Sequence, residues 1–183
     1  MSAIAGSRTL RIACVLAASE IDANHSDIIV FPEGVSIKEV DAARLAYPRA
    51  ILVAAVAERN SRNAEKHCRG ILFHQGRNQI DYLKVGSDGR TVGSGYTNQN
   101  SICEIGDLCI GVLICLDIDD VAFSNAVLAR MKASLSKIKL LCIPADMGDY
   151  WFPQDIYPFP GKFEGIYVAL CNNTITHQAR CRS

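Results

Sequence analysis

The chain has 183 residues, of which 49% are hydrophobic, and its 19 basic residues balance 19 acidic ones. This length is typical of one domain with a sizeable core, so we expect a single domain over residues 1–183. The apolar fraction is too high for a disordered chain, and the zero net charge removes the electrostatic argument for binding nucleic acid or an anionic membrane. No apolar run reaches the roughly 18 residues of a membrane span, and the short run over 12–18 fits a first strand better than a signal peptide.

The first half of the chain alternates short apolar runs with amphipathic ones. Strands are expected over 10–17, over 27–31 (closed by Pro32) and over 51–57. Helical spacing of apolar residues predicts a helix over 37–47 that ends before Pro48. A polar loop over 58–69 then leads to a hairpin whose strands, 70–74 and 79–84, flank a turn over 75–78.

The second half begins with a glycine-rich loop over 86–100. Strands are expected over 101–104, 108–115, 140–143 and 165–170, and a helix over 117–137 with Asp119 or Asp120 near its start. Buried strands followed by helices indicate a layered α/β protein. The sheet should be mixed, because the hairpin interrupts a purely parallel progression.

The eight cysteines invite a disulfide or metal interpretation. The sequence contains no Cys-x-x-Cys pair, and only His67 and Cys68 are neighbours, where adjacent residues rarely chelate one metal. Several cysteines stand inside apolar runs, where a thiol behaves as a small buried hydrophobe. We therefore predict reduced thiols in a cytoplasmic protein and no metal site.

Three reactive side chains follow buried apolar runs, which is where sheet folds gather their sites. Glu33 follows Pro32, Lys84 closes the hairpin, and Cys115 ends the run over 110–114. A helix N-terminus and an ammonium group both favour an ionised thiol, and a carboxylate can accept the thiol proton. A lysine can hold the oxyanion that forms when a thiolate attacks a carbonyl carbon. Together the three side chains supply the nucleophile, the base and the oxyanion-stabilising charge that acyl transfer requires.

Each of the three also has an ordinary interpretation. Cys115 fits a buried core thiol, Glu33 a residue favoured at a helix start, and Lys84 a side chain that reaches solvent from an exposed strand. Composition and spacing leave both interpretations open. The local sequences around the three residues favour the chemical one.

These local sequences resemble three motifs of the nitrilase superfamily of carbon–nitrogen hydrolases. Residues 27–34 resemble its glutamate motif, and residues 81–84 resemble its lysine motif, with Tyr82 two positions before Lys84. Residues 110–117 resemble its nucleophile motif, in which an apolar strand runs into Cys and an Asp follows two positions later. The three occur in the family's order, and the resemblance covers the chain from about Arg11 to Thr176.

The resemblance implies an α-β-β-α sandwich with mixed sheets and hydrolysis of an amide or nitrile through a thioester acyl-enzyme. By the resemblance Glu33 is the general base, Lys84 stabilises the tetrahedral intermediate, and Cys115 is the nucleophile. The backbone N–H of Leu116 would complete the oxyanion site. No metal or organic cofactor is implied, and family members often pair, so we expect a homodimer or higher homo-oligomer acting on a small linear amide.

The chain departs from the family's usual pattern in four respects. It is short, so part of the usual C-terminal strands should be lacking or reduced to residues 179–183. The loop over 86–100 holds no second glutamate, Leu116 replaces an aromatic residue, and a histidine usual near the lysine is absent. The aromatic stretch around Trp151 is either part of a substrate pocket or a loop over the core.

These departures keep two alternatives open. One is a catalytically degenerate nitrilase-like domain that binds a ligand or partner without turnover. The other is a generic α/β binding protein with chance motif matches, in which Glu33, Lys84 and Cys115 would point to different places. The identity of the amide lies beyond the sequence, since pocket shape decides it.

Overall fold

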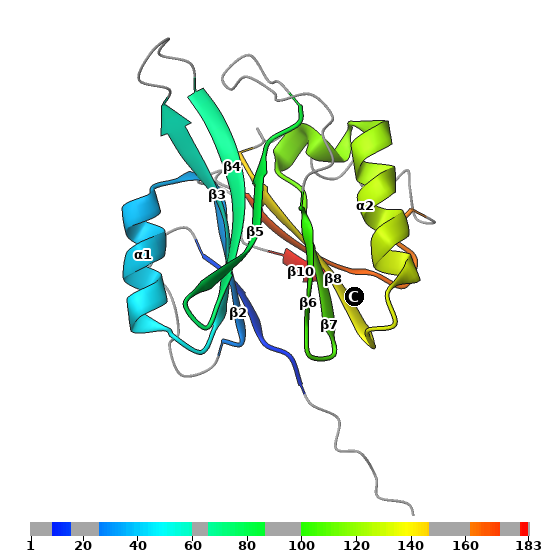
Figure 1. Cartoon of the computed structure of the whole chain (residues 1–183), viewed down its shortest axis with the longest axis horizontal. Coiled ribbons are helices and arrows are strands. Elements are labelled where there is room, and N and C mark those ends of the chain that lie inside the picture. The colour runs from blue at the N-terminus through cyan, green and yellow to red at the C-terminus, as the bar shows by residue number, and fades with distance from the viewer. Residues whose placement is uncertain are drawn as a thin grey trace, which may run out of the picture.

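Two β-sheets lie face to face between two helices in the computed structural model, which describes residues 9–15, 26–59, 66–86, 100–146, 162–172 and 180–182. Figure 1 shows the layers in the order α1, first sheet, second sheet, α2. The protein is therefore an α-β-β-α sandwich, as the sequence predicts.

The first sheet has five strands in the order β1-β2-β3-β4-β5. Their bounds are β1 (Ile12–Cys14), β2 (Ile28–Val35), β3 (Ile51–Arg59), β4 (Lys66–His74) and β5 (Arg77–Leu83). Strands β1 to β3 run parallel, whereas β4 and β5 add antiparallel neighbours at one edge. The sheet is therefore mixed, because the β4–β5 hairpin reverses the chain.

The second sheet repeats this plan in the order β10-β9-β8-β7-β6. Its strands are β6 (Ile102–Ile105), β7 (Leu108–Val112), β8 (Ile138–Ala145), β9 (Tyr167–Asn172) and β10 (Arg180–Arg182). Strands β7 to β9 are parallel, and β6 and β10 pair antiparallel at the two edges. The reduced C-terminal strand expected over 179–183 is β10.

Each outer helix begins at a side-chain cap. Helix α1 (Ile37–Ala46) has a capping box, in which Ser36 Oγ accepts from the Glu39 N–H at 3.3 Å and Glu39 Oε2 accepts from the Ser36 N–H at 3.0 Å. Helix α2 (Val121–Ala133) begins at Asp120, whose Oδ1 accepts from the Phe123 N–H at 2.9 Å. Helix α1 packs Val40 and Ala43 on the first sheet, and α2 packs on the second.

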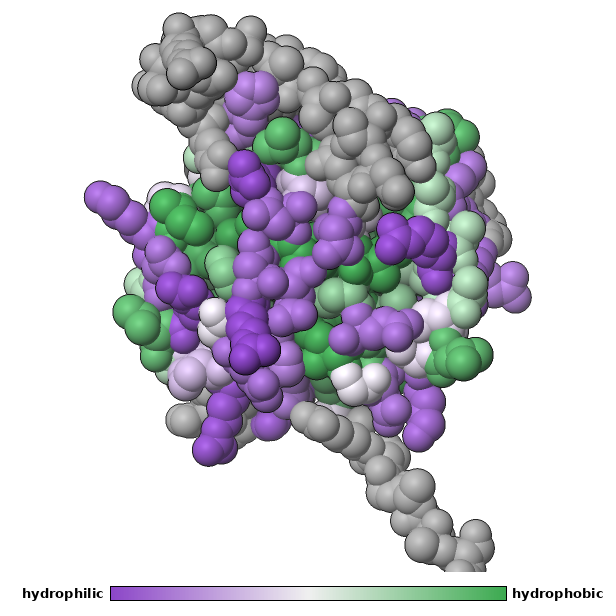
Figure 2. All heavy atoms as spheres, viewed as in Figure 1, coloured by the Kyte–Doolittle hydropathy of each residue, from purple (hydrophilic) through white to green (hydrophobic). Residues whose placement is uncertain are grey.

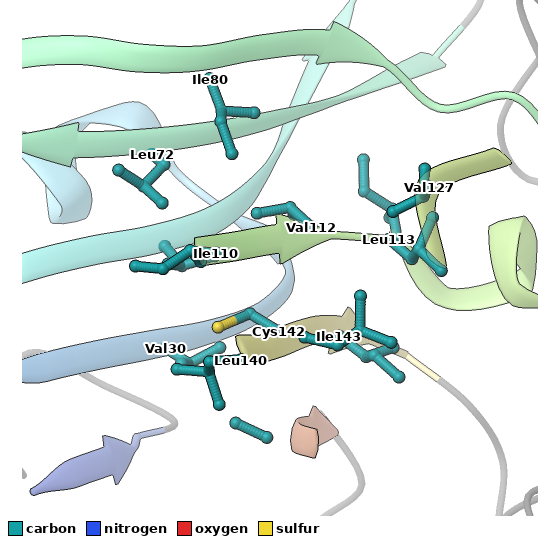
Figure 3. Close-up of a cluster of buried hydrophobic side chains, with 14 of the residues drawn as sticks. Val30, Leu72, Ile80, Ile110, Val112, Leu113, Val127, Leu140, Cys142 and Ile143 are labelled. Atoms are coloured by element: carbon teal, nitrogen blue, oxygen red, sulfur yellow. The ribbon is translucent and has the colours of Figure 1, made fainter. Parts of the chain in front are cut away.

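The main core fills the space between the sheets. Figure 3 shows side chains of β2, β4, β5, β7 and β8 converging there, among them Val30, Leu72, Ile80, Ile110 and Cys142. The exposed side of β5 is polar, and its Asp81 Oδ1 lies 2.6 Å from Arg69 Nη1 of β4. Figure 2 shows a band of hydrophilic side chains over this part of the surface. Charged side chains on an edge strand oppose pairing with another chain.

Several expected boundaries were wrong, among them the first strand, which covers only Ile12–Cys14. Strand β2 continues through Pro32, and the polar stretch 58–69 contributes to β3 and β4, which pair as far as Arg59 and Lys66. The helix expected over 117–137 is instead a 3₁₀ helix over Cys115–Ile118 followed by the shorter α2. Residues 58–59 and 66–69 lengthen β3 and β4 by backbone pairing, which does not require an apolar pattern.

Glycine at position 70 makes room for a buried ring. Gly70 of β4 lies opposite Tyr82 of β5, and a Cβ added at Gly70 would overlap Tyr82 Cε1 and lie 2.9 Å from Tyr82 Cδ1. The ring is 2% exposed and packs against Phe123 of α2 at 5.7 Å between centroids, so it has little freedom to move aside. Any larger residue at position 70 must displace it.

We therefore expect Gly70→Ala to lower the free energy of unfolding by about 1–3 kcal/mol, through overpacking against Tyr82. Urea denaturation followed by circular dichroism measures this change. The control is Leu45→Ala, because Leu45 of α1 is 80% exposed and its truncation should change the free energy by less than about 0.5 kcal/mol. A Gly70→Ala protein as stable as the wild type would contradict this packing argument.

Candidate active site

Glu33 faces the interior because two irregularities in β2 change the side on which residues point. Ile28 and Val30 face the other sheet, and Ile29 and Phe31 face α1. Strict alternation would place Glu33 with Ile29 and Phe31. The register between β2 and β3 shifts between Val30 and Glu33, where Pro32 has no N–H to donate to the ladder. This shift turns Glu33 inward.

A second shift in register returns the strand to its first pattern. It falls between Glu33 and Val35, at Gly34, whose φ of 91° suits glycine. Val35 is again on the α1 side of the sheet. Glu33 is thus the residue that the two irregularities present to the interior, where it is 6% exposed.

Lys84 reaches the same place from β5. It follows Leu83, and its N–H donates to the Cys68 carbonyl at 2.8 Å, which extends the ladder by one residue. Ile80 and Tyr82 face the main core, and Lys84 continues their face by the period of a strand. Its side chain is fully buried, which excludes the ordinary interpretation of a lysine that extends to solvent.

Cys115 lies at a sharp turn after β7. The strand ends at Val112, and the 3₁₀ helix over Cys115–Ile118 begins at the thiol residue itself. Its φ is 46°, a left-handed conformation that costs a residue with a side chain about 1–2 kcal/mol. The surrounding structure must therefore hold this turn, and the cysteine is 3% exposed.

The carboxylate and the ammonium group form a buried ion pair. Lys84 Nζ lies 2.7 Å from Glu33 Oε1 and donates a hydrogen bond to it. Glu33 Oε2 is buried and has no hydrogen-bond partner among the described residues. The pair therefore keeps one carboxylate oxygen available as a proton acceptor inside the protein.

The thiol of Cys115 is protonated at rest. Burial raises its pKa to about 12, with a further increase from the negative charge of Glu33. A hydrogen bond from the backbone of Asp146 and the positive charge of Lys84 lower it by less. Lys84 thus favours the thiolate, as expected, but burial and the Glu33 charge outweigh it. The helix that begins at Cys115 is a single 3₁₀ turn.

Two buried residues near this group have no role in the sequence-based account. Cys68 of β4 is 1% exposed, and burial and the Glu33 charge raise the pKa of its thiol. Asp117 is fully buried between Tyr82 and the turn at Cys115. Asp117 belongs to the nucleophile motif over residues 110–117, so its place two positions after Cys115 could have marked it as part of the site. Nothing in the sequence marked Cys68, which stands in the stretch 58–69 that was expected to be a loop.

The weaker candidates are placed only in part. Leu116 is the second residue of the 3₁₀ helix, in a first turn where N–H groups have no partner within the helix. Trp151 lies outside the described residues. The structure brings Glu33, Lys84 and Cys115 together, and the scattered arrangement of a chance match is not observed.

Other features of the described residues lie away from this group. A hollow of about 640 Å³ opens where β2, β3, β7 and β8 begin, at the opposite end of the sandwich, with Asp27, Ile51, Leu108 and Ile138 in its walls. Among the residues placed in the structure, no cluster of three or more His, Cys, Asp or Glu side chains is arranged to hold a metal ion. No helix within these ranges is long and apolar enough to cross a membrane.

No protein-family model and no curated protein sequence matches the chain. Solved structures do match it. An amidase from Nesterenkonia sp. superposes with a TM-score of 0.60 at 20% identity, over 89% of this chain and 73% of that one. Saccharomyces cerevisiae Nit3, a member of branch 10 of the nitrilase superfamily, gives a TM-score of 0.62 at 14% identity, over 86% and 67%.

A further structure of the Nesterenkonia amidase carries the product of Michael addition of acrylamide at its active-site cysteine. It superposes with a TM-score of 0.60 at 18% identity, over 89% of this chain and 76% of that one. The likeness at these identities concerns the fold, and this chain is shorter than each of the matched proteins. The protein has the fold of the nitrilase superfamily.

Proposed function

We propose that the protein is a carbon–nitrogen hydrolase that cleaves a small linear amide through a thioester on Cys115. The observation that carries the proposal is the buried Glu33–Lys84 ion pair beside the Cys115 thiol, with Glu33 Oε2 left unpaired. A buried ion pair is an expensive arrangement that adds little net stability, so its presence beside a strained cysteine favours a chemical role.

The first step requires a base. With a thiol pKa of about 12, the thiolate at pH 7 amounts to about one molecule in 10⁵. Glu33 Oε2 therefore takes the thiol proton as sulfur attacks the amide carbon, in the manner of general base catalysis. Attack forms the C–S bond and moves the carbonyl electron pair onto oxygen.

The oxyanion then needs positive charge and hydrogen-bond donors. The Lys84 ammonium group supplies the charge from a site that water does not reach, where such an interaction is strong. The N–H of Leu116 is the second donor in this proposal. Lys84 is held against Glu33 before substrate arrives, so little reorganisation accompanies the reaction.

The two halves of the reaction use the same carboxyl group. Protonated Glu33 gives its proton to the leaving nitrogen as the C–N bond breaks, which releases ammonia and leaves the thioester. Glu33 then deprotonates a water molecule that attacks the thioester carbon. The C–S bond breaks, and the departing thiolate takes that proton from Glu33, which regenerates the Cys115 thiol. Amide and water are consumed, and carboxylic acid and ammonia are formed.

The preference for an amide over a nitrile rests on the resemblance in sequence, in which amidases are the broader class. The structures of the Nesterenkonia amidase support it, one of them being a complex with butyramide. The expected homo-oligomer and cytoplasmic location stay predictions.

We expect the wild-type protein to release ammonia from acetamide, propionamide or butyramide, and Cys115→Ala to abolish this activity because the acyl group has no acceptor. A coupled ammonia assay measures the rates. The matched control is Cys103→Ala, a half-buried thiol on β6, which should hydrolyse at the wild-type rate.

Hydrolysis that persists in Cys115→Ala would rule out this mechanism. A wild-type protein with no turnover of any short amide, and an inert Cys115, would instead support the degenerate binding domain.

Glu33→Gln should move two measurements in opposite directions. The negative charge of Glu33 raises the pKa of Cys115, so its removal lowers that pKa, and alkylation of Cys115 by iodoacetamide at pH 8 becomes faster. Amide hydrolysis should fall by about 10²-fold or more, because the base is lost. Peptide mapping and the ammonia assay give the two rates.

Glu104→Gln, a change on the exposed side of β6, should alter neither rate. If alkylation and hydrolysis both fall in Glu33→Gln, the carboxylate supports the structure of the site and does not act as its base.

A further inference from the structure

Asp117 is a buried carboxylate that the proposed chemistry does not use. It is the third residue of the 3₁₀ helix that starts at Cys115, and its exposed fraction is zero. Burial raises its pKa to about 6, against several hydrogen bonds that lower it. The carboxylate is therefore ionised at neutral pH in a place where charge is unfavourable, which requires compensating partners.

Four donors surround this carboxylate. Asp117 Oδ1 accepts from the N–H groups of Val85 and Gly86, both at 2.9 Å. Asp117 Oδ2 accepts from the Ile114 N–H at 3.2 Å and from the Tyr82 hydroxyl at 3.1 Å. A carboxylate has about four acceptor positions, so all of them are used.

The donors come from the two segments that carry the reactive groups. Val85 and Gly86 directly follow Lys84, which comes from the first sheet, and Ile114 directly precedes Cys115, which comes from the second. One side chain thus connects the backbone of the lysine segment to the backbone of the cysteine turn. Lys84 follows the last residue of β5, and its N–H makes one further ladder bond to the Cys68 carbonyl before the chain reaches Val85 and Gly86.

The same side chain closes the strained turn. The Asp117 N–H donates to the Ile114 carbonyl at 2.9 Å, while Asp117 Oδ2 accepts from the Ile114 N–H at 3.2 Å. These two bonds enclose Cys115, whose φ is 46°. They compensate for the unfavourable backbone conformation that directs the thiol toward Glu33 and Lys84.

We infer that Asp117 is a positioning residue, whose carboxylate sets the distance between the Lys84 ammonium group and the Cys115 turn. The inference rests on the proposed function of that site. Displacement of a reacting group by about 1 Å can cost on the order of 10²-fold in rate, so a residue of this kind affects the chemical step without touching substrate.

Asparagine cannot replace the carboxylate, because its amide nitrogen is a donor. Placed at Oδ2, the nitrogen would face the Ile114 N–H, and placed at Oδ1 it would face two N–H groups. Asp117→Asn therefore keeps the size of the side chain and loses at least one backbone link. This makes it the informative variant.

The test measures acylation of Cys115 by p-nitrophenyl acetate in rapid mixing, as p-nitrophenolate release, with the adduct located by peptide mapping. In Asp117→Asn the acylation rate constant at saturation should fall ten- to a hundredfold, with the half-saturating concentration changed less than about threefold. Tyr82→Phe is the matched control. It removes a donor to the same carboxylate but neither backbone link, and it should acylate within about threefold of the wild-type rate.

A second pair of variants changes only the link between Asp117 and the segment that follows Lys84. This pair also provides a test if Asp117→Asn does not fold. Gly86→Pro removes the N–H that donates to Oδ1, whereas Gly86→Ala keeps it, and a Cβ there meets only ordinary contacts of 3.5 Å and more. We expect slower acylation in Gly86→Pro and near wild-type acylation in Gly86→Ala. Equal rates in this pair, or a wild-type rate in folded Asp117→Asn, would overturn the inference.

Amide hydrogen exchange separates this inference from the proposed function, since it needs no activity. In Asp117→Asn, exchange should accelerate at Ile114 or at Val85 and Gly86, on whichever side the amide nitrogen replaces the carboxylate oxygen, while the N–H groups of β8 stay as protected as in the wild type. Unchanged protection of these three groups would overturn the inference. A wild-type protein that does not acylate Cys115 would refute the proposed function, and exchange would still decide the role of Asp117.

Discussion

The buried ion pair between Glu33 and Lys84 is the contact around which the candidate site of this protein is built. Two opposite charges 2.7 Å apart are withdrawn from water between two sheets, at a desolvation cost of several kcal/mol per ion. The loss of either partner would leave the other charge buried and unpaired, which costs about 3–5 kcal/mol. Truncation of either residue therefore affects folding as well as chemistry. Glu33→Gln is the more informative change, because its amide oxygen can still accept from the Lys84 ammonium group.

The surrounding strands are shaped to accommodate this pair. Two register shifts in β2 turn Glu33 inward and then restore the pattern, and Gly70 of β4 leaves room for the Tyr82 ring. The Tyr82 ring fills the space over Gly70, and its hydroxyl donates a hydrogen bond to Asp117. The geometry of the site is thus set by strand irregularities and small side chains as much as by the reactive residues.

The pKa of Cys115 changes how its reactivity is understood. A nucleophilic cysteine is often activated by stabilising its thiolate. Here burial and the Glu33 charge keep the thiol neutral, with a pKa of about 12, so in the proposed mechanism proton removal must accompany attack. A thiol of this kind is protected from adventitious reagents until a substrate carbonyl lies beside it.

Much of the architecture could be predicted from the sequence. The apolar runs predicted most strands, and helix α1 followed from its spacing and Pro48. The three local motifs predicted the sandwich and singled out Glu33, Lys84 and Cys115, which the structure brings together. The inward direction of Glu33 could not be predicted. Strict alternation of side chains along β2 would place Glu33 on the α1 side, and the register shift that reverses this leaves no mark in the pattern of apolar residues. The extent of β3 and β4 depends on backbone pairing beyond the core, and the pKa of Cys115 depends on burial and on the distance to Glu33.

The most direct test of the central claim is to trap the acyl-enzyme during turnover. The protein is mixed with butyramide, quenched in acid at steady state, digested and analysed by mass spectrometry. If Cys115 is the nucleophile, one butyryl group is found on the peptide that contains it, and none on Cys68 or any other thiol. Hydrolysis with no acyl group on Cys115, or with the group on a different residue, would contradict the central claim.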